Sequence, residues 1–385
     1  MWYLTDERQL VLDATKEFVR TEVAPQVAEI EKTSAFPHDL FKRAGELGLI
    51  GLTIPAEYGG TGIDQTASAL VLEEIAKTMP VLTIAMGAHA LLAGGLIQML
   101  GSDEQKRTWL APAATGEIIL ACASTEPVGG DNQVEFTTRA VREGDGWVLN
   151  GAKCLICNTG VADAYVVIAV TADTVDPLTK AGLSAFIVPA GTAGLTVGEA
   201  EHKLGWHGSA TGSVYFDDVH LPAEALLGAE GGCLQAMFVS ASAEFLSCGP
   251  VSLGIAEGAY AMALDYSMTR TQQGKCMFDR FQVTRHKLAR MWGEIESLRA
   301  LVYSTYAQRD AGQLELAKAR LMKIKGAEVS EYVAREAIQL FGGVGTIVDT
   351  GVERYWRDAK VMAIGGASVE ALIDVVAGLI KAGRA

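Results

Sequence analysis

The spacing of hydrophobic residues changes twice along this chain of 385 residues. Up to about residue 118, apolar residues recur at the three- and four-residue intervals of amphipathic helices. From 119 to about 228 the pattern becomes short β-rich runs separated by clusters of Gly, Asp and Pro. The helical period then returns in long segments at about 233–270, 283–310 and 314–341. The sequence therefore predicts an α+β chain with an N-terminal helical domain (1–118), a central β-barrel or sandwich (119–228) and a C-terminal helical bundle (229–385).

Charge and composition exclude several classes of protein. The net charge of −14 and pI near 5.0 argue against a nucleic-acid partner, because no basic stripe is available to neutralise phosphates. With 49% hydrophobic and 20% charged residues, the chain can bury a substantial core. Its first residues show no basic region followed by an apolar one, and no unbroken apolar run reads as long enough for a bilayer. We expect a cytoplasmic protein without a membrane span.

The six cysteines are sparse and irregularly spaced, which does not fit a disulfide framework in a chain of this size. Cys154 and Cys157 match C-x-x-C, but they lie in an apolar stretch that reads as a strand. Side chains three residues apart on a strand point to opposite faces, so they cannot share one metal ion or close an easy disulfide. We expect free thiols and no metal site.

Several short motifs follow one another along the chain. They are Thr125–Pro127, Asn150-Gly151-x-Lys153 with Ile156 and Asn158, His202–Gly205, Val214–Val219 with Pro222, Arg270 and Gly274 with Gln282, Phe341-Gly342-Gly343-x-Gly345, and Arg357-Asp358. In this order and at these distances they resemble the acyl-CoA dehydrogenase family. The resemblance covers the whole chain and implies a C-terminal four-helix bundle.

The same resemblance implies FAD as the cofactor. Thr125 would contact the flavin ring through its backbone and hydroxyl, and Ile156 and Cys157 would lie in the strand beside it. Arg270 would reach the flavin pyrophosphate across a subunit interface, because a planar guanidinium suits phosphate oxygens. At least a homodimer is therefore expected, and a homotetramer or a heteromer is compatible.

Four further cofactor-binding positions follow from the resemblance: Gln282, Gln339, Gly342 and Gly343. The two glycines would let backbone N–H groups approach the adenosine diphosphate part of a neighbouring flavin. Without the flanking motifs, a helix end with a glycine cap explains them equally well.

Glycine stands where this family usually keeps its catalytic glutamate. The family motif I-x-E-G-T corresponds to Ile364–Ser368, and the glutamate position holds Gly366, which has no side chain to accept a proton. Other departures fall near the expected flavin and substrate, namely Asp131, Leu155, Cys157, Gln273 and Phe245. A carboxylate at 131 beside a pyrophosphate is unfavourable, and a phenylalanine at 245 in place of the usual arginine weakens the inference of coenzyme A.

Glu244 is the candidate replacement base. One branch of the family, including enzymes similar to isovaleryl-CoA dehydrogenase, places its glutamate on the long helix after the β-domain, at the spacing to Leu-Gly that Glu244 has here. Small and apolar neighbours would desolvate this carboxylate and raise its pKa. An ordinary helix glutamate without a catalytic role remains the alternative, and Glu370, about one turn beyond Gly366, is a weaker candidate. Ser124, Phe245 and Gly366 are the expected substrate-binding positions.

Three functions are compatible with these residues. The first is an FAD-dependent acyl-thioester dehydrogenase in which Glu244 removes the α-proton, with an acyl-CoA or acyl-carrier-protein thioester as substrate and an electron-transfer flavoprotein as partner. The second is an elimination, such as removal of a sulfur group, without net oxidation. The third is a non-catalytic subunit of a heteromeric dehydrogenase.

Overall fold

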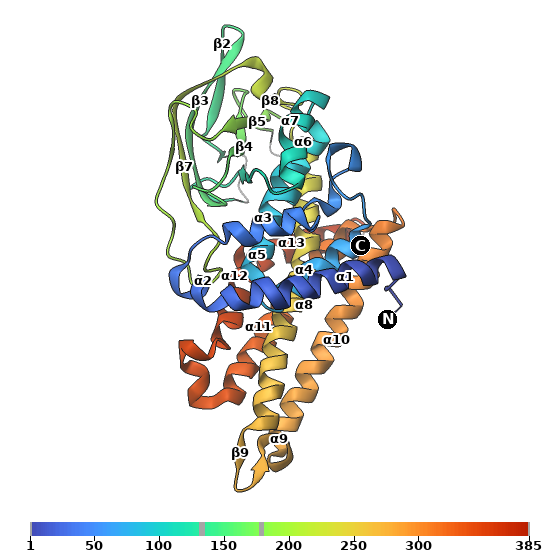
Figure 1. Cartoon of the computed structure of the whole chain (residues 1–385). Coiled ribbons are helices and arrows are strands. Elements are labelled where there is room, and N and C mark those ends of the chain that lie inside the picture. Colours follow the sequence, from blue (N-terminus) through green and yellow to red (C-terminus); the bar gives the residue numbers. More distant parts are fainter. Residues whose placement is uncertain (1, 131–134, 177–180, 384–385) are drawn as a thin grey trace.

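The computed structural model describes residues 2–130, 135–176 and 181–383. A β-domain forms one end of the molecule, a long helical bundle forms the other, and the N-terminal helices pack across the middle (Figure 1). The predicted α+β class, with helical, β and helical parts in this order, is confirmed.

The N-terminal part consists of short helices whose starts are marked by capping side chains. Thr5, Asp64 and Ser102 each accept a backbone N–H at the start of a helix, which satisfies a donor that the helix leaves unpaired. The helices are α1 (Asp6–Phe18), α2 (Val27–Thr33), α3 (His38–Glu46), α4 (Gln65–Ala76), α5 (Pro80–Met86), α6 (Gly94–Leu100) and α7 (Asp103–Ala114).

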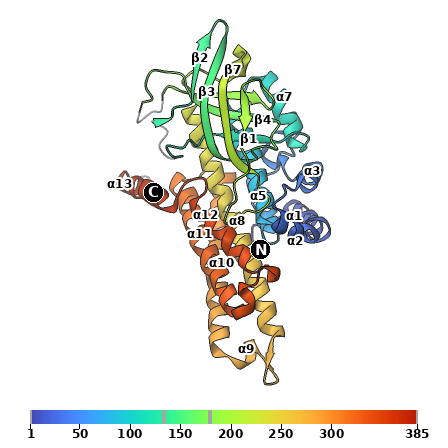
Figure 2. The same ribbon diagram turned by 90° about the vertical axis from the view of Figure 1, so that its left-hand side faces the viewer.

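The β-domain is one continuous sheet that curls around its own core (Figure 2). Its strands are β1 (Leu120–Ala123), β2 (Arg139–Glu143), β3 (Gly146–Cys157), β4 (Ala164–Val170), β5 (Leu183–Pro189), β6 (Leu195–Val197), β7 (Thr211–Leu221) and β8 (Leu226–Leu227). They pair in the order β6-β7-β3-β2-β4-β5-β8, and β1 pairs with β4. Trp147 on β3 meets Phe186 on β5 edge to face, although these strands are not neighbours in the sheet.

The C-terminal part is built from long helices that match the predicted segments closely. They are α8 (Leu234–Thr269), α9 (Met277–Arg280), α10 (Gln282–Asp310), α11 (Leu316–Phe341), α12 (Glu353–Ile364) and α13 (Val369–Lys381), with a small hairpin, β9 (Thr271–Gln272) and β10 (Lys275–Cys276), after α8. α8 begins against the β-domain, packs on α4, α10 and α11, and ends at the far end of the bundle (Figure 1).

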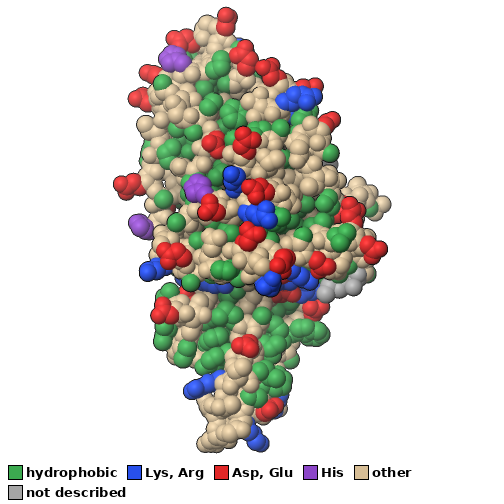
Figure 3. All heavy atoms as spheres, viewed as in Figure 1, with side chains coloured by type: hydrophobic (Ala, Val, Ile, Leu, Met, Phe, Trp, Pro, Cys, Tyr) green, Lys and Arg blue, Asp and Glu red, His purple; other side chains and the backbone are tan. Residues whose placement is uncertain are grey.

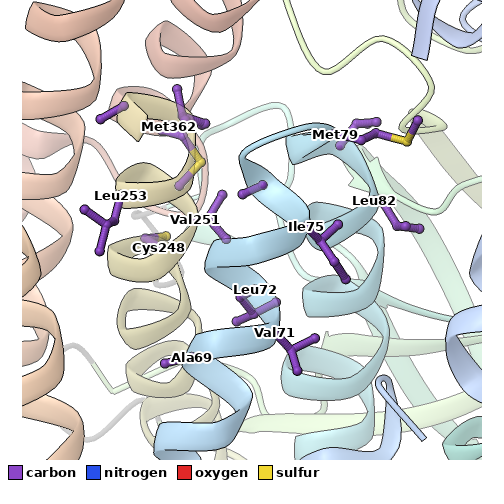
Figure 4. Close-up of a cluster of buried hydrophobic side chains, with 14 of the residues drawn as sticks. Ala69, Val71, Leu72, Ile75, Met79, Leu82, Cys248, Val251, Leu253 and Met362 are labelled. Carbon is purple, nitrogen blue, oxygen red and sulfur yellow. The ribbon is translucent and has the colours of Figure 1, made fainter. Parts of the chain in front are cut away.

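The N-terminal helices and the bundle share one core. Buried side chains of α4, among them Leu72 and Ile75, lie beside Val251 of α8 and Met362 of α12 (Figure 4). The approach is close because Gly254 of α8 has no side chain: a Cβ there would lie 2.4 Å from the Glu73 carbonyl oxygen.

Among the described residues, two helical stretches are long and apolar enough to cross a membrane, Pro80–Leu100 and Val239–Thr269, and α12 with α13 would be a third if this bent pair were one span. In each of the first two, 72% of the most apolar window is buried inside the protein. Their hydrophobicity therefore serves the shared core, and the absence of a membrane span stays a prediction.

Substitution of Gly254 by alanine should destabilise the fold by about 1–3 kcal/mol, because the new methyl group would overlap the α4 backbone. Urea denaturation and thermal melting measure the change. Gly293→Ala on α10 is the matched control, since a Cβ there meets nothing within 4 Å and alanine is the better helix former. Equal stability of the two variants would contradict the close approach.

Candidate active site

A cavity of about 440 Å³ lies between the β-domain and the start of the bundle. Glu244 and Phe245 of α8 form one wall, and Gly366 and Ala367, in the connection between α12 and α13, form another. The β-domain contributes Ser124, Thr125, Leu155 and Cys157, and the apolar part of the lining comes from Ala88, Leu92, Leu96, Ile168 and Met237. The structure thus brings the predicted base and all three predicted substrate positions into one cavity.

The Glu244 carboxylate occupies the space beside the glycine that replaces the usual base. A Cβ added to Gly366 would lie 2.6 Å from Glu244 Oε1 and 2.9 Å from its Cδ. Gly366 also has φ +78°, in the left-handed region that glycine adopts without strain. A side chain at 366 would therefore require the Glu244 carboxylate to move from this position.

Burial raises the pKa of the Glu244 carboxyl, and the positive charge of Lys323 opposes this by a smaller amount. Within the described part of the chain, the carboxylate forms no hydrogen bond or ion pair. Burial also raises the pKa of the nearby Cys122 thiol to about 12 and of Cys248 to about 11. These thiols stay neutral at physiological pH, whereas burial makes the Glu244 carboxylate a stronger proton acceptor than a solvent-exposed glutamate.

A buried ion pair holds the β-domain wall. Lys153 Nζ donates to the Ser124 carbonyl (2.9 Å) and to Glu126 Oε1 (2.9 Å), and the side chains of Lys153 and Glu126 are fully buried. Burial acts to raise the pKa of Glu126, but Lys153 and the N–H groups of Thr137 and Thr138 outweigh it and hold that pKa below its usual range. This pair fixes the turn that carries Ser124 and Thr125.

A bulge in β3 opens the sheet beside the cavity. The register of β3 with β7 shifts between Lys153 and Ile156, where Leu155 adopts φ +56° and is 63% exposed. Cys157 lines the cavity, whereas the Ile156 side chain is buried in the β-core, which leaves only its backbone to face a ligand. All six cysteines are free, as predicted.

Two cations near Phe245 were not recognised from the sequence. The Phe245 ring centroid lies 5.7 Å from the Arg320 guanidinium carbon and 5.6 Å from Lys323 Nζ, and both residues belong to α11. Positive charge therefore reaches the place of the missing arginine from a different helix. The sequence predicted the helix α11 from its hydrophobic period, but it did not show which of the basic residues on this helix would face Phe245.

The remaining predicted cofactor positions lie far from this cavity. Arg270, Gln282, Gln339, Gly342 and Gly343 are exposed and grouped at the opposite end of the bundle, where α8 and α11 end (Figure 1). From Glu244 to the end of α8 is roughly 38 Å at 1.5 Å per residue. Asp131 lies outside the described residues, and Glu370 is exposed on α13.

Comparison with known proteins decides the family. Models of the N-terminal, middle and C-terminal domains of acyl-CoA dehydrogenase match residues 5–117, 121–219 and 240–380. The short-chain-specific acyl-CoA dehydrogenase of Clostridium acetobutylicum is 38% identical, over 98% of both chains. The chain belongs to the acyl-CoA dehydrogenase family.

Solved structures of this family share the fold. Butyryl-CoA dehydrogenase from Megasphaera elsdenii has a TM-score of 0.93 and 34% identity, with 98% of each chain covered. A glutaryl-CoA dehydrogenase from Mycobacterium smegmatis in complex with FADH2 has a TM-score of 0.93 and 27% identity, covering 100% of this chain and 96% of its own. This acyl-CoA dehydrogenase is a flavin-dependent oxidoreductase, and FAD is its cofactor.

The described residues fit FAD both at the cavity and at the far end of the bundle. At the cavity, the β3 bulge offers an open edge beside Thr125 and Cys157. At the far end of the bundle, a Cβ added to Gly342 or Gly343 meets nothing within 4 Å, so their backbone is open to a ligand. Gly130 lines the same cavity and lies so close to Thr125 that a Cβ there would be 3.1 Å from Thr125 Oγ1.

Lys153→Met should destabilise the enzyme by about 3–5 kcal/mol, because it leaves the Glu126 carboxylate buried without its cation. Denaturant unfolding measures the loss. Arg142→Met, which breaks the exposed Arg142–Glu230 pair of the same domain, is the matched control and should cost about 1 kcal/mol or less. A small effect of Lys153→Met would show that the pair does not anchor this wall.

Proposed function

We propose that Glu244 is the base that removes the α-proton of an acyl-CoA thioester during FAD-dependent α,β-dehydrogenation. The observation that supports this most directly is the overlap between the Glu244 carboxylate and the space that a side chain at Gly366 would need. The Glu244 carboxylate thus lies where a side chain at 366 would begin, but it comes from α8 instead of from the connection between α12 and α13.

The residues of the cavity have separate tasks in this proposal. Leu92, Leu96 and Met237 contact the acyl chain and exclude water, which keeps the Glu244 carboxylate a stronger base than it would be in solution. The Gly366 N–H has no acceptor among the described residues, so it is available to the thioester carbonyl oxygen as the α-carbon gains negative charge. When bound, FAD supplies the acceptor for the hydride that leaves the β-carbon.

A short acyl chain is the substrate class to test first. The Clostridium relative is named for short-chain substrates and the Megasphaera relative for butyryl-CoA. The cavity must hold the acyl group and also leave Thr125, Leu155 and Cys157 accessible to the flavin ring. Because the cavity of about 440 Å³ must also leave this access, it favours a short acyl chain over a long one.

Three further inferences concern partners and place. A second copy of the chain would bring its Arg270 and Gly342 to the flavin, because these residues lie too far from their own Glu244 to share one cofactor with it. Exposed apolar side chains on the bundle, such as Trp292 (56% exposed), support an interface there, and Figure 3 shows hydrophobic side chains gathered over this region. An electron-transfer flavoprotein is the proposed electron acceptor, and the cytoplasm is the proposed location.

Glu244→Gln should slow flavin reduction by about 10²–10⁴-fold, because the amide keeps the shape of the side chain but cannot accept a proton. Stopped-flow measurement of anaerobic bleaching with butyryl-CoA gives the rate, and a binding titration should show substrate affinity retained. Glu370→Gln, at the exposed alternative, should behave as wild type.

Bleaching at the wild-type rate in Glu244→Gln would reject the assignment of the base. Product formation by the wild-type enzyme without bleaching would favour an elimination. A colourless purified protein that no added FAD restores would favour a non-catalytic subunit.

The rate of flavin reduction should rise with pH as Glu244 loses its proton. Because burial raises the pKa of this carboxyl from its ordinary 4.5, the midpoint of the rise should lie above that value. Below the midpoint the carboxyl is protonated and cannot act as the base, so activity falls toward acid pH. A reduction rate that stays constant down to pH 4.5 would argue against this base.

A further inference from the structure

The connection that carries Gly366 is held in place by a buried lysine. Lys323 of α11 is fully buried, and its Nζ donates to the Ala367 carbonyl oxygen (2.7 Å) and to the Gly365 carbonyl oxygen. These two carbonyls flank Gly366 on either side. Within the described part of the chain, Lys323 forms no ion pair with a carboxylate. Its charge is therefore balanced chiefly by backbone dipoles of this connection.

The connection needs such an external support. The connection between α12 and α13 begins with two consecutive glycines, Gly365 and Gly366, and glycine loses more conformational freedom on folding than any other residue. Neither residue has a side chain with which to pack. Burying an ammonium group is unfavourable unless its N–H donors are satisfied. The two carbonyls therefore fix the position of the Lys323 ammonium, and the ammonium in turn fixes the two carbonyls.

The support acts on the base through a short chain of contacts. Gly366 closes directly against the Glu244 carboxylate, as the 2.6 Å separation of its would-be Cβ from Oε1 shows. Phe245, the neighbour of Glu244 on α8, has its ring centroid 5.6 Å from Lys323 Nζ. The ammonium thus lies behind both the glycine and the helix segment that carries the base. Its positive charge also opposes the rise in the Glu244 pKa caused by burial.

We infer that Lys323 is the positioning residue of the Glu244 base: its ammonium clamps the Gly365 and Ala367 carbonyls so that Gly366 confines the carboxylate at the substrate α-carbon. This inference rests on the proposed role of Glu244. Lys323 does not touch the substrate; it acts through the backbone of Gly366 and through its charge.

Other charged and titratable groups near Glu244 do not supply this effect. Cys122 on β1, Cys157 on β3 and Cys248 on α8 are thiols whose pKa burial raises, so they carry no charge at neutral pH. Arg320 on α11 lines the cavity and remains cationic, because a guanidinium keeps its proton in proteins. On α13, Glu370 and Asp374 are exposed. Lys323 is the cation that acts on the Glu244 pKa and also contacts the Gly366 connection.

Lys323→Met tests the clamp in the FAD-loaded enzyme. The substitution keeps the length of the stem but removes the donors and the charge. Limiting flavin reduction with butyryl-CoA should slow on the order of 10²-fold at neutral pH, as expected for a misplaced catalytic group, with little change in KM. The midpoint of the pH profile should move to higher pH, because the charge that lowers the Glu244 pKa is gone.

Two companion variants separate positioning from folding. Lys323→Arg retains the charge but not the compact ammonium, so its pH midpoint should stay near that of wild type while its rate falls. Lys325→Met lies two residues away on α11, where Lys325 pairs with Glu328 at the surface, and it should match wild type in both rate and midpoint. If Lys323→Met does not fold, Lys323→Arg carries the test, and a wild-type rate in that variant overturns the inference.

A folded Lys323→Met enzyme with the wild-type rate and midpoint would overturn the inference. Equal losses in the methionine and arginine variants with an unchanged midpoint would also overturn it, because a purely structural role predicts that result. The Glu244→Gln variant distinguishes failure of the proposed base from failure of the proposed positioning residue. A wild-type rate of bleaching in Glu244→Gln would reject the assignment of Glu244 as the base. An inactive Glu244→Gln together with an unaffected Lys323→Met would reject only the positioning role of Lys323.

Discussion

The contact between the Glu244 carboxylate and the Gly366 backbone is the constraint on which the rest of the site depends. The two groups compete for the same space, since a side chain at 366 would lie within 3 Å of the carboxylate. The position of the Glu244 carboxylate and the absence of a side chain at 366 are therefore coupled. A side chain at 366 would require the Glu244 carboxylate to move, so the glycine leaves room for the carboxylate in this position.

Two walls of the cavity are each held by a buried lysine that donates hydrogen bonds to backbone carbonyls. Lys153 donates to the Ser124 carbonyl on the β-domain side, and Lys323 donates to the Gly365 and Ala367 carbonyls on the bundle side. The two cases differ in charge balance. Lys153 has Glu126 as a buried counter-ion, whereas Lys323 has no carboxylate of its own within the described residues and acts on Glu244. One lysine thus mainly stabilises a turn, and the other also affects the pKa of the base.

The length of α8 explains why the motifs of this family are spread over the chain. The helix carries Glu244 past the cavity and ends at the opposite end of the bundle beside Arg270 (Figure 1). Its glycines at 254 and 258 let α4 approach closely, so the helix is fixed along its length by the N-terminal part. In the proposed function, a flavin would contact residues from both ends of this helix only if two copies of the chain contributed, and the exposed apolar side chains of the bundle suit such an assembly.

The sequence by itself determined the order of the helical and β parts, the long C-terminal helices, the free thiols and the position of Glu244 relative to Leu253-Gly254, because periodicity and spacing are local properties. It did not show that the Glu244 carboxylate meets Gly366, since these residues are far apart in the chain. Nor did it show that Lys323 is buried while Lys325 is exposed. That choice depends on how α11 is rotated against α8 and on where the connection after α12 passes, and only tertiary packing sets both. Whether a lysine is a solvated surface charge or a buried clamp is decided by the carbonyls that surround it, and those come from a distant part of the chain.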